Sequence, residues 1–186
     1  MELWDIYDAD KKPTGRTMKR NDWCLKDDEY HLTVLGVVAH KDGRFLITKR
    51  VMTKNWAPGW WEVSGGAAMA GEESKEAILR EVKEETGLTL THWRSRGLLT
   101  FIWGNMTEFI HLYTADGWTG EMIQGDACRE GVLEWVPKEK VEQLPIWEGD
   151  KIFFKLLNEE HPWFSLKLVY EGDVLRQAVL DGKRVV

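Results

Sequence analysis

The segment from residue 66 to residue 88 constrains this chain most strongly, because it leads a glycine-rich turn into a helix with an acidic face. Ala, Glu and Lys dominate residues 74–86, with Ser74 expected as the N-cap and Gly87 as the helix stop. At about 100° per residue, three glutamates share one arc of roughly 100° on this helix: Glu81, Glu84 and Glu85. Like charges at this spacing destabilise an isolated helix, so the face is either solvated or opposed by a cation.

The glycines before this helix indicate what the acidic face serves. Gly65, Gly66 and Gly71 bracket a turn whose backbone can approach a ligand closely. Gly66 and Gly71 have the glycine spacing of a P-loop, but Glu72 and Glu73 stand where that motif requires Lys and Ser or Thr. A direct phosphate cradle is therefore excluded. A hard cation such as Mg²⁺ takes oxygen ligands, and it would join the acidic helix to an anionic diphosphate.

The composition is that of a folded, soluble protein, and it excludes one class of partner. The chain has 186 residues, enough for one domain with a sizeable core. Its 25 Lys and Arg against 31 Asp and Glu give a net charge of −6, the wrong sign for gripping a nucleic-acid polymer. Eleven Trp residues are more than a core of this size usually takes, so some are expected to face a ligand.

Cysteine usage and the apolar runs favour a cytoplasmic protein. Cys24 and Cys128 are the only cysteines and lack C-x-x-C spacing, so we expect free thiols. The first twelve residues, MELWDIYDADKK, lack the basic start and apolar stretch of a signal peptide. The longest apolar run, residues 32–39, is far too short to span a membrane, so no membrane partner is expected.

Apolar and β-branched runs between turn residues predict strands with helices between them, so the expected fold class is α/β or α+β in one domain, 1–186. Residues 1–30 are expected to form an N-terminal β-hairpin extension. Asp42-Gly43 predicts a hairpin of residues 32–39 with 45–50. Loops are expected at 51–59 and from 116 to about 130, further strands at 60–63, 98–103, 109–115, 133–136, 164–170 and 174–180. Pro137 is expected to open a helix over 138–144, and another helix is expected at 151–158.

Residues 66–88 read GAAMAGEESKEAILREVKEETGL, which matches every fixed position of the Nudix box. The chain therefore resembles the Nudix family. The resemblance implies an α/β/α sandwich with a mixed β-sheet and hydrolysis of a nucleoside diphosphate linked to another group. In that reaction water attacks a phosphorus of the pyrophosphate bridge while divalent metals neutralise charge on the oxygens.

The resemblance also assigns roles within the box. Glu81, Glu84 and Glu85 would bind the metal together with the carbonyl oxygen of Gly65. Arg80 would orient the glutamates, Glu72 would support the loop and helix, and Gly66 and Gly87 would support the backbone. Met69 departs from the pattern, because many family members carry a Glu at this position.

Residues 129–137, REGVLEWVP, resemble the segment of MutT-type enzymes that contributes a further glutamate to the metal site. Glu130 is the expected ligand, and it would also take part in catalysis. Glu134, next to Trp135, is the rival for this role. The alternative for Glu130 is a surface acid at the edge of a loop.

The segment from Leu144 to Asp150 and the two elements after it resemble the C-terminal part of 8-oxo-dGTP diphosphatases. By this resemblance Trp147 would stack on a purine and Asp150 would hydrogen-bond its edge. Gly149 departs from the pattern, since it stands where a second Asp is found. The alternative is that Trp147 packs at a helix start and Asp150 caps the helix at Lys151.

The N-terminal third resembles Nudix proteins related to isopentenyl-diphosphate isomerase, through Trp4-Asp5-Ile6-Tyr7-Asp8, Gly15 and Tyr30-His31. That isomerase needs a Cys shortly before its degenerate box, whereas residues 56–64 contain none and Glu84-Glu85 is intact, which favours hydrolysis. The five histidines, at positions 31, 40, 92, 111 and 161, show no metal-binding spacing and are expected to be structural or at the surface.

Together these patterns predict a hydrolase that depends on Mg²⁺ or Mn²⁺. It would cleave a nucleoside triphosphate, an ordinary or oxidised purine such as 8-oxo-dGTP, to monophosphate and pyrophosphate. The alternatives are an ADP-ribose or nucleotide-sugar pyrophosphatase, an isoprenoid-diphosphate isomerase, and a catalytically silent module that binds nucleotide. The partner is expected to be a small-molecule nucleotide or another diphosphate, and both a monomer and a homodimer remain open.

Overall fold

The computed structural model describes residues 2–53, 57–124 and 128–186. The first half contains β1 (Leu3–Asp8), β2 (Pro13–Lys19), β3 (Glu29–Val38), β4 (Arg44–Arg50), β5 (Trp61–Glu62), β6 (Ser64–Ala67) and the helix α1 (Ser74–Thr86). The second half contains β7 (Thr89–Trp103), β8 (Met106–Thr119), β9 (Gly131–Pro137), the 3₁₀ helix η2 (Lys138–Gln143), α2 (Glu148–Asn158), β10 (Phe164–Glu171), β11 (Val174–Leu180) and β12 (Lys183–Arg184). The loops predicted at 51–59 and before residue 130 include residues 54–56 and 125–127, which lie outside the described residues.

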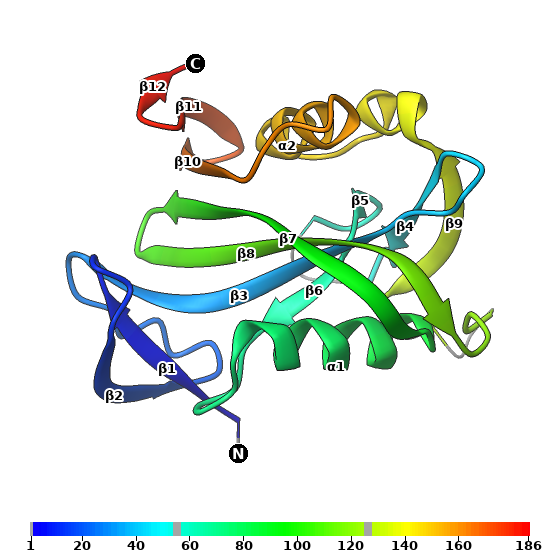
Figure 1. Ribbon diagram of the computed structural model, residues 1–186. Coiled ribbons are helices and arrows are strands. Elements are labelled where there is room, and N and C mark those ends of the chain that lie inside the picture. Colours follow the sequence, from blue (N-terminus) through cyan, green and yellow to red (C-terminus); the bar gives the residue numbers. More distant parts are fainter. Residues whose placement is uncertain (1, 54–56, 125–127) are drawn as a thin grey trace.

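A mixed sheet of nine strands forms the centre of the molecule (Figure 1). Its strands follow the order β12-β11-β10-β7-β8-β3-β1-β2, and β6 also pairs with β3. β3 runs parallel to β8 and β10 runs parallel to β7, while the remaining pairs are antiparallel. β7 and β8 extend well beyond the predicted strands 98–103 and 109–115.

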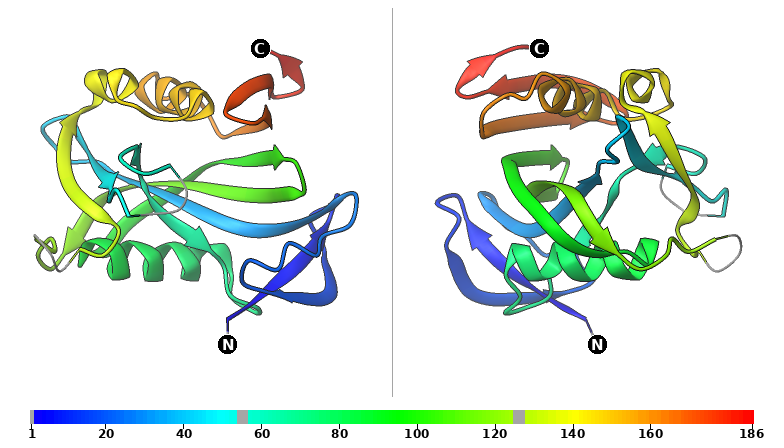
Figure 2. Two further views of the ribbon diagram at one scale, coloured as in Figure 1. Left: turned by 180° about the vertical axis from the view of Figure 1, so that it is seen from behind. Right: turned by 45° about the vertical axis from the view of Figure 1, so that its right-hand side comes forward.

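A second sheet of three strands, β5-β4-β9, stands beside the first (Figure 2). The predicted hairpin of residues 32–39 with 45–50 is therefore only partly right. The turn forms, since the His40 N–H donates to the Arg44 carbonyl, but pairing stops at one bridge between Ala39 and Phe45. β3 then joins the large sheet and β4 pairs with β9, so each strand finds longer partners elsewhere.

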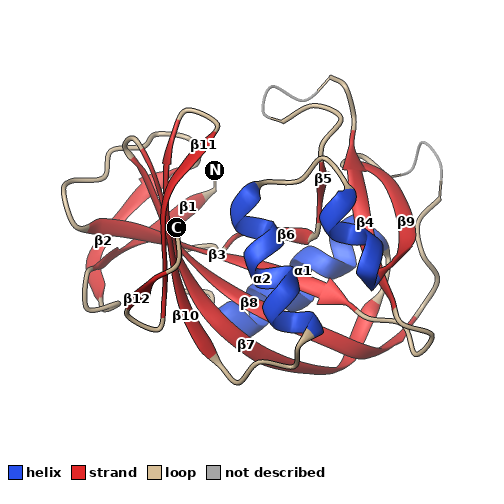
Figure 3. Cartoon of the chain, turned by 90° about the horizontal axis from the view of Figure 1, so that it is seen from above, coloured by secondary structure: helices blue, strands red, loops and turns tan. Residues whose placement is uncertain are grey.

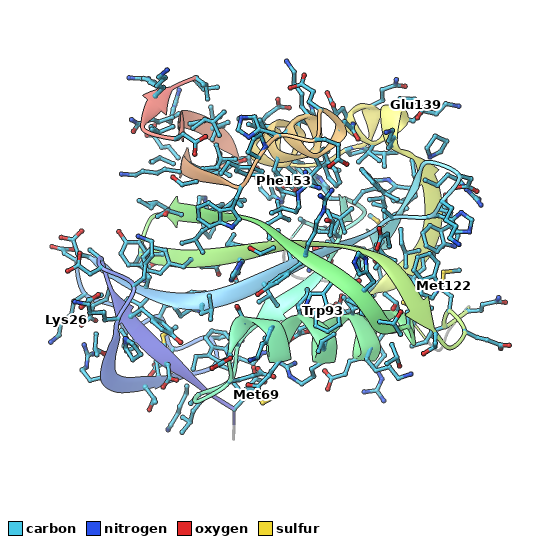
Figure 4. The ribbon with its side chains drawn as sticks, in the orientation of Figure 1. Lys26, Met69, Trp93, Met122, Glu139 and Phe153 are labelled. Carbon is cyan, nitrogen blue, oxygen red and sulfur yellow. The ribbon has the colours of Figure 1, made fainter. Side chains whose placement is uncertain are left out.

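The two α-helices cover opposite faces of the large sheet (Figures 1 and 3). α1 buries Ala77, Ile78 and Val82 against Val34 and Val38 of β3. The face covered by α2 forms a larger core around Phe153, which lies between that helix and the sheet (Figure 4). The arrangement confirms the expected α/β/α sandwich with a mixed sheet.

The helix ends differ from two predictions. Glu73, not Ser74, is the N-cap of α1, and a reciprocal capping box joins Glu73 and Glu76. Ser74 lies inside the helix, where its hydroxyl contacts the Tyr113 hydroxyl at 2.7 Å. The helix expected over 138–144 forms as a 3₁₀ helix over residues 138–143, and Pro137, the last residue of β9, is its N-cap rather than its first residue. Gly87 does end α1, with φ of 80°.

The N-terminal hairpin of β1 and β2 extends the large sheet, because β1 pairs antiparallel with β3. Trp4, Ile6 and Met18 are buried there in a small separate core. Ile6 stands directly opposite His31 in the β1–β3 register, which brings the hairpin beside the N-terminal end of β3.

Candidate active site

A cavity of about 940 Å³ connects the C-terminal end of the glycine-rich strand with α1, the start of α2 and the N-terminal hairpin. Four box or loop glutamates line it: Glu81, Glu84, Glu85 and Glu130. Gly65, Gly66, Arg80, Trp147 and Asp150 line it as well. Among the described residues that line the cavity, eight carry carboxylates and four are arginines, so acidic groups outnumber basic ones there.

The two glycines at the start of the box allow the strand and the helix to touch. β6 pairs with β3, with Gly65 opposite Leu35 and Gly66 opposite Val34. A Cβ added at Gly66 would lie only 2.5–2.7 Å from the carboxylate atoms of Glu81. A side chain at this position would therefore push Glu81 out of its place, which is the physical reason for glycine here.

Arg80 holds the turn and the helix together. Its Nε and one terminal nitrogen each donate to Glu72 at 2.8 Å, and its other terminal nitrogen donates to Glu81 at 2.7 Å. It also donates to the carbonyl of Ala67 at 3.2 Å. Glu72 in turn accepts the Met69 N–H at 2.8 Å. The two arms of this guanidinium therefore fix the supporting loop on one side and a candidate ligand on the other.

Glu85 is the most strongly perturbed glutamate of the box. Its carboxylate accepts the N–H of Gly65 at 3.2 Å, beside the carbonyl expected to bind metal. Burial raises the pKa of Glu85 to about 8, and neighbouring carboxylates, that of Glu81 foremost, add to the rise. Burial likewise raises the pKa of Glu81, although Arg80 opposes this shift.

Glu84 and Glu130 complete the acidic end from two directions. Glu84 lies at the rim, with its side chain 61% exposed and its carboxylate 3.5 Å from Arg80. Glu130 comes from the loop before β9 and faces the same cavity, near enough to Glu85 to raise its pKa. Glu134, the rival for this role, is exposed on β9 and lies outside the residues that line the cavity.

These oxygen donors suit a hard divalent cation in type, since carboxylates and a main-chain carbonyl are the ligands that Mg²⁺ and Mn²⁺ take. Among the described residues, however, no group of three or more His, Cys, Asp or Glu side chains is arranged to hold a metal ion. Glu81 is instead bound to Arg80, and Glu85 is bound to the main chain of Gly65. The donors nevertheless line one cavity, and together they supply the oxygen ligands that such an ion takes.

Trp147 and Asp150 stand at the start of α2 and line the same cavity as the acidic residues. The Trp147 ring lies 4.6 Å from that of Trp60 and meets Tyr170 edge-on at 5.6 Å. No side chain caps this helix, so Asp150 does not act as its cap, and α2 begins at Glu148 rather than at 151. Burial, followed by the charge of Glu62, raises the pKa of Asp150 to about 8.

Several residues that line the cavity could not be recognised from the sequence. Arg50 and Glu62 form an ion pair at 2.5 Å between β4 and β5, and Arg129 adjoins Glu130. The Tyr170 hydroxyl accepts the N–H of Gly149 at 2.8 Å and so positions the start of α2. The position of Glu62 three residues before Gly65 could have indicated a cavity residue. The strand pairing that turns its side chain inward, however, cannot be read from the sequence.

The two cysteines stand apart from this chemistry. Cys24 is exposed and Cys128 is buried, and both are free thiols as expected. The thiol of Cys128 contacts the main-chain carbonyl of Glu85 at 3.6 Å, behind the acidic helix. Neither cysteine belongs to the residues that line the cavity.

Known proteins share this architecture. The NUDIX domain family matches residues 29–157. An uncharacterised Nudix hydrolase of Listeria monocytogenes is 36% identical over 169 residues, which is 90% of this chain and 96% of the relative. The oxidized purine nucleoside triphosphate hydrolase of Danio rerio is 28% identical over 152 residues, 81% and 93% of the two chains. The crystal structure of a MutT protein from Bacillus halodurans superimposes with a TM-score of 0.72 at 28% identity, covering 81% of this chain and 97% of that one.

The fold, the acidic cavity and these relatives define a hydrolase that acts on phosphoric anhydrides. The chain belongs to the Nudix family and is similar to its MutT members. Proteins of this family generally use divalent metal ions and act on small-molecule nucleotides. No helix in the described part of the chain is long and apolar enough to cross a membrane.

Proposed function

We propose that this chain hydrolyses a nucleoside triphosphate, in particular an oxidised purine such as 8-oxo-dGTP, to the monophosphate and pyrophosphate, with Mg²⁺ or Mn²⁺. One observation carries the proposal: a single cavity joins the acidic end at Glu81 and Glu85 to the aromatic and polar end at Trp147 and Asp150. The Danio rerio relative, whose name describes hydrolysis of oxidised purine nucleoside triphosphates, supports the choice of substrate.

At the acidic end, Glu81, Glu84, Glu85, Glu130 and the carbonyl of Gly65 would hold the ion. When bound, the ion neutralises phosphate charge and polarises water. The chain's own contribution is placement: Arg80 fixes Glu81, and the Gly65 N–H fixes Glu85. Arg129 and Arg50, which pairs with Glu62, also line the cavity and would supply positive charge toward the phosphates.

At the other end, Trp147 offers an aromatic face for a base, and Asp150 distinguishes purines. Oxidation at C8 of guanine turns N7 from a hydrogen-bond acceptor into a donor, while O6 remains an acceptor. With its pKa raised to about 8, Asp150 is protonated at neutral pH and presents one donor and one acceptor. That pair matches the N7–H and O6 of 8-oxoguanine, whereas guanine offers two acceptors to it.

The test is a Mg²⁺ assay of the purified protein against 8-oxo-dGTP, dGTP, ADP-ribose, a nucleotide sugar and isopentenyl diphosphate. The proposal expects 8-oxo-dGTP to be the best substrate. Preferred turnover of ADP-ribose or of a nucleotide sugar would replace the triphosphate by a diphosphate-linked substrate at the same site. Rearrangement of isopentenyl diphosphate, or nucleotide binding without turnover of any of them, would overturn hydrolysis itself.

Binding should depend on the cation as well. Because carboxylates outnumber arginines among the described residues of the cavity, a triphosphate should be repelled without a divalent ion. Calorimetry should therefore find weak nucleotide binding in EDTA and much tighter binding in Mg²⁺ or Mn²⁺. Equal affinity in the two conditions would indicate a module that grips something other than the phosphates.

A further inference from the structure

Two buried polar atoms on β3 have no hydrogen-bond partner in the structure. Among the described residues only three buried side-chain nitrogen or oxygen atoms are in this position, and two of them line the cavity. They are Nδ1 of His31, which is 1% exposed, and Oγ1 of Thr33, which is 8% exposed. A buried polar group without a partner costs free energy, so these two atoms call for a ligand.

The strand register fixes where these atoms stand. On β3, Leu35 lies opposite Gly65 and Thr33 lies opposite Ala67, so both polar residues point to the cavity side along with Leu35. At about 3.3 Å per residue, Thr33 stands roughly 7 Å and His31 roughly 13 Å along the strand from the Gly65 level. Both residues are therefore displaced along β3 from Gly65, where the phosphates are expected to bind.

The floor beside them is apolar except at Glu108. Thr33 stands next to Ile110 of β8, and Ile110 stands next to Leu99 of β7. In the neighbouring row, His31 stands next to Glu108, and Glu108 next to Phe101. All of these residues line the cavity. A flat ring with apolar faces and a polar edge fits such a floor, with its edge toward β3.

The N-terminal hairpin closes this end of the cavity and fixes the His31 ring. Trp4 stacks on His31 at 4.8 Å with an interplanar angle of 8°, and Trp23 meets it edge-on at 5.3 Å. Nε2 of His31 lies 3.0 Å from the Glu108 carboxylate and donates to it, since a carboxylate only accepts. In neutral His31 the other nitrogen, Nδ1, is then an acceptor that the packing cannot turn away.

We infer that His31 and Thr33 form a base-reading wall, in which Nδ1 of His31 accepts from, and the Thr33 hydroxyl bonds with, the edge of the substrate's nucleobase. The wall rests on the proposed function and adds to it a second recognition surface, across the cavity from Asp150. It also gives the N-terminal hairpin a role, because Trp4 and Trp23 hold the His31 ring in place. None of these residues belongs to the Nudix box.

The test compares Thr33→Val, which removes the hydroxyl at nearly unchanged volume, with Thr33→Ser, which restores it. Binding of 8-oxo-dGMP, dGMP, dAMP and dCMP is measured by calorimetry in Mg²⁺. We expect Thr33→Val to raise the Kd of the preferred monophosphate about tenfold, which is one buried hydrogen bond, and Thr33→Ser to recover most of it. With a hydrolysed triphosphate, KM should rise while kcat stays within about twofold, because the contact is far from the reacting phosphorus.

Thermal unfolding and a matched control separate binding from packing. Thr33→Val should unfold no earlier than the wild type, since the hydroxyl has no partner in the described structure. Thr114→Val changes a threonine of β8 next to Val37, outside the cavity lining, and should leave binding unchanged. An equal loss of binding in Thr114→Val and Thr33→Val would indicate a general packing effect and overturn the wall.

The inference and the proposed function fail in different ways. Wild-type affinity in Thr33→Val, or no binding of any monophosphate by the wild type, overturns the base-reading wall even if triphosphates are hydrolysed. Failure to hydrolyse any triphosphate overturns the proposed function. A Thr33→Val variant that loses monophosphate binding would still support the wall in that case.

Discussion

At the scale of single residues, Glu84 and Glu85 are neighbours on α1 but lie in different surroundings. Glu85 is held against the main chain among other carboxylates, whereas Glu84 is mostly exposed beside Arg80. Neither side chain packs in the apolar core beneath α1, to which the helix contributes Ala77, Ile78 and Val82. We therefore expect the charge of these two glutamates to serve a bound ion rather than the apolar core.

Glu84→Gln and Glu85→Gln should each abolish nearly all turnover. Loss of a carboxylate that would hold the ion should cost on the order of several kcal/mol of transition-state stabilisation. Without divalent ion the thermal stability should not fall. For Glu85→Gln it should rise at neutral pH, because the buried Glu85 carboxyl, with its pKa raised to about 8, holds a proton that the unfolded chain has lost. Wild-type rates in both variants at saturating Mg²⁺ would show that the metal site has been wrongly assigned.

Asp150 should make the stability of the metal-free protein depend on pH. Its pKa is raised from an ordinary value of 3.8 to about 8, so between these values the folded state holds a proton that the unfolded state has lost. Stability therefore falls as pH rises across this window. Thermal unfolding in EDTA between about pH 5 and pH 9 should show a shallower fall for Asp150→Asn than for the wild type. Identical slopes would mean that Asp150 is not buried as the structure has it.

Trp147 and Asp150 should have separable effects on substrate choice. Trp147→Ala should raise KM for all purine triphosphates together, because stacking tolerates any base and is worth about 1–3 kcal/mol. Asp150→Ala, which removes both the donor and the acceptor, should instead reduce the preference for 8-oxo-dGTP over dGTP by roughly tenfold or more. Steady-state kinetics with both substrates measure the two effects. Unchanged purine kinetics in Trp147→Ala would remove this residue from the binding site.

At the scale of elements, the turn from β6 into α1 depends on the guanidinium of Arg80. Glu72 receives two of its N–H groups and Glu81 receives another, and both carboxylates are largely buried. Lys can replace the charge but not this fork of donors. The loop and the candidate ligand are therefore tied to the geometry of one side chain.

Arg80→Lys should lower both stability and turnover. Leaving part of the Glu72 and Glu81 carboxylates without donors should cost about 1–3 kcal/mol of unfolding free energy. Turnover should fall further, because Glu81 loses its fixed position. Lys83→Arg on the same helix, where Lys83 donates to the carbonyl of Gly87, is the control and should change little. Arg80→Lys kinetics equal to those of Lys83→Arg would contradict the positioning role.

The elements also show what local sequence could and could not predict. The 74–86 helix follows from its composition and its glycine stop, and its bounds are confirmed. The predicted pairing of β3 with β4 was largely wrong. Asp42-Gly43 specifies only the turn between them, whereas β3 pairs with β8 and β4 with β9, which lie far along the chain. Ser74 was mistaken for the cap because Glu73 and Glu76 cap each other instead.

At the scale of the whole molecule, the cavity is built from segments that lie far apart in the sequence. The box glutamates and the glycine turn were predictable, since their spacing lies within 23 consecutive residues. Glu62, His31 and Thr33 were not, because only strand pairing turns their side chains into the space under α2. His31 was expected to be structural or at the surface; its ring is buried and stacks on Trp4, and the residue also lines the cavity.

The proposed reaction is tested most directly by incubating 8-oxo-dGTP with the protein and Mg²⁺ and resolving the products by ion-exchange chromatography. We predict 8-oxo-dGMP and pyrophosphate in equal amounts, without 8-oxo-dGDP or free phosphate. Neither the Glu85→Gln variant nor the wild type in EDTA should give these products. Release of 8-oxo-dGDP and phosphate would show cleavage between the β- and γ-phosphates and would contradict the proposed cleavage between the α- and β-phosphates. An intact triphosphate, while ADP-ribose or a nucleotide sugar is cleaved under the same conditions, would contradict the assigned substrate.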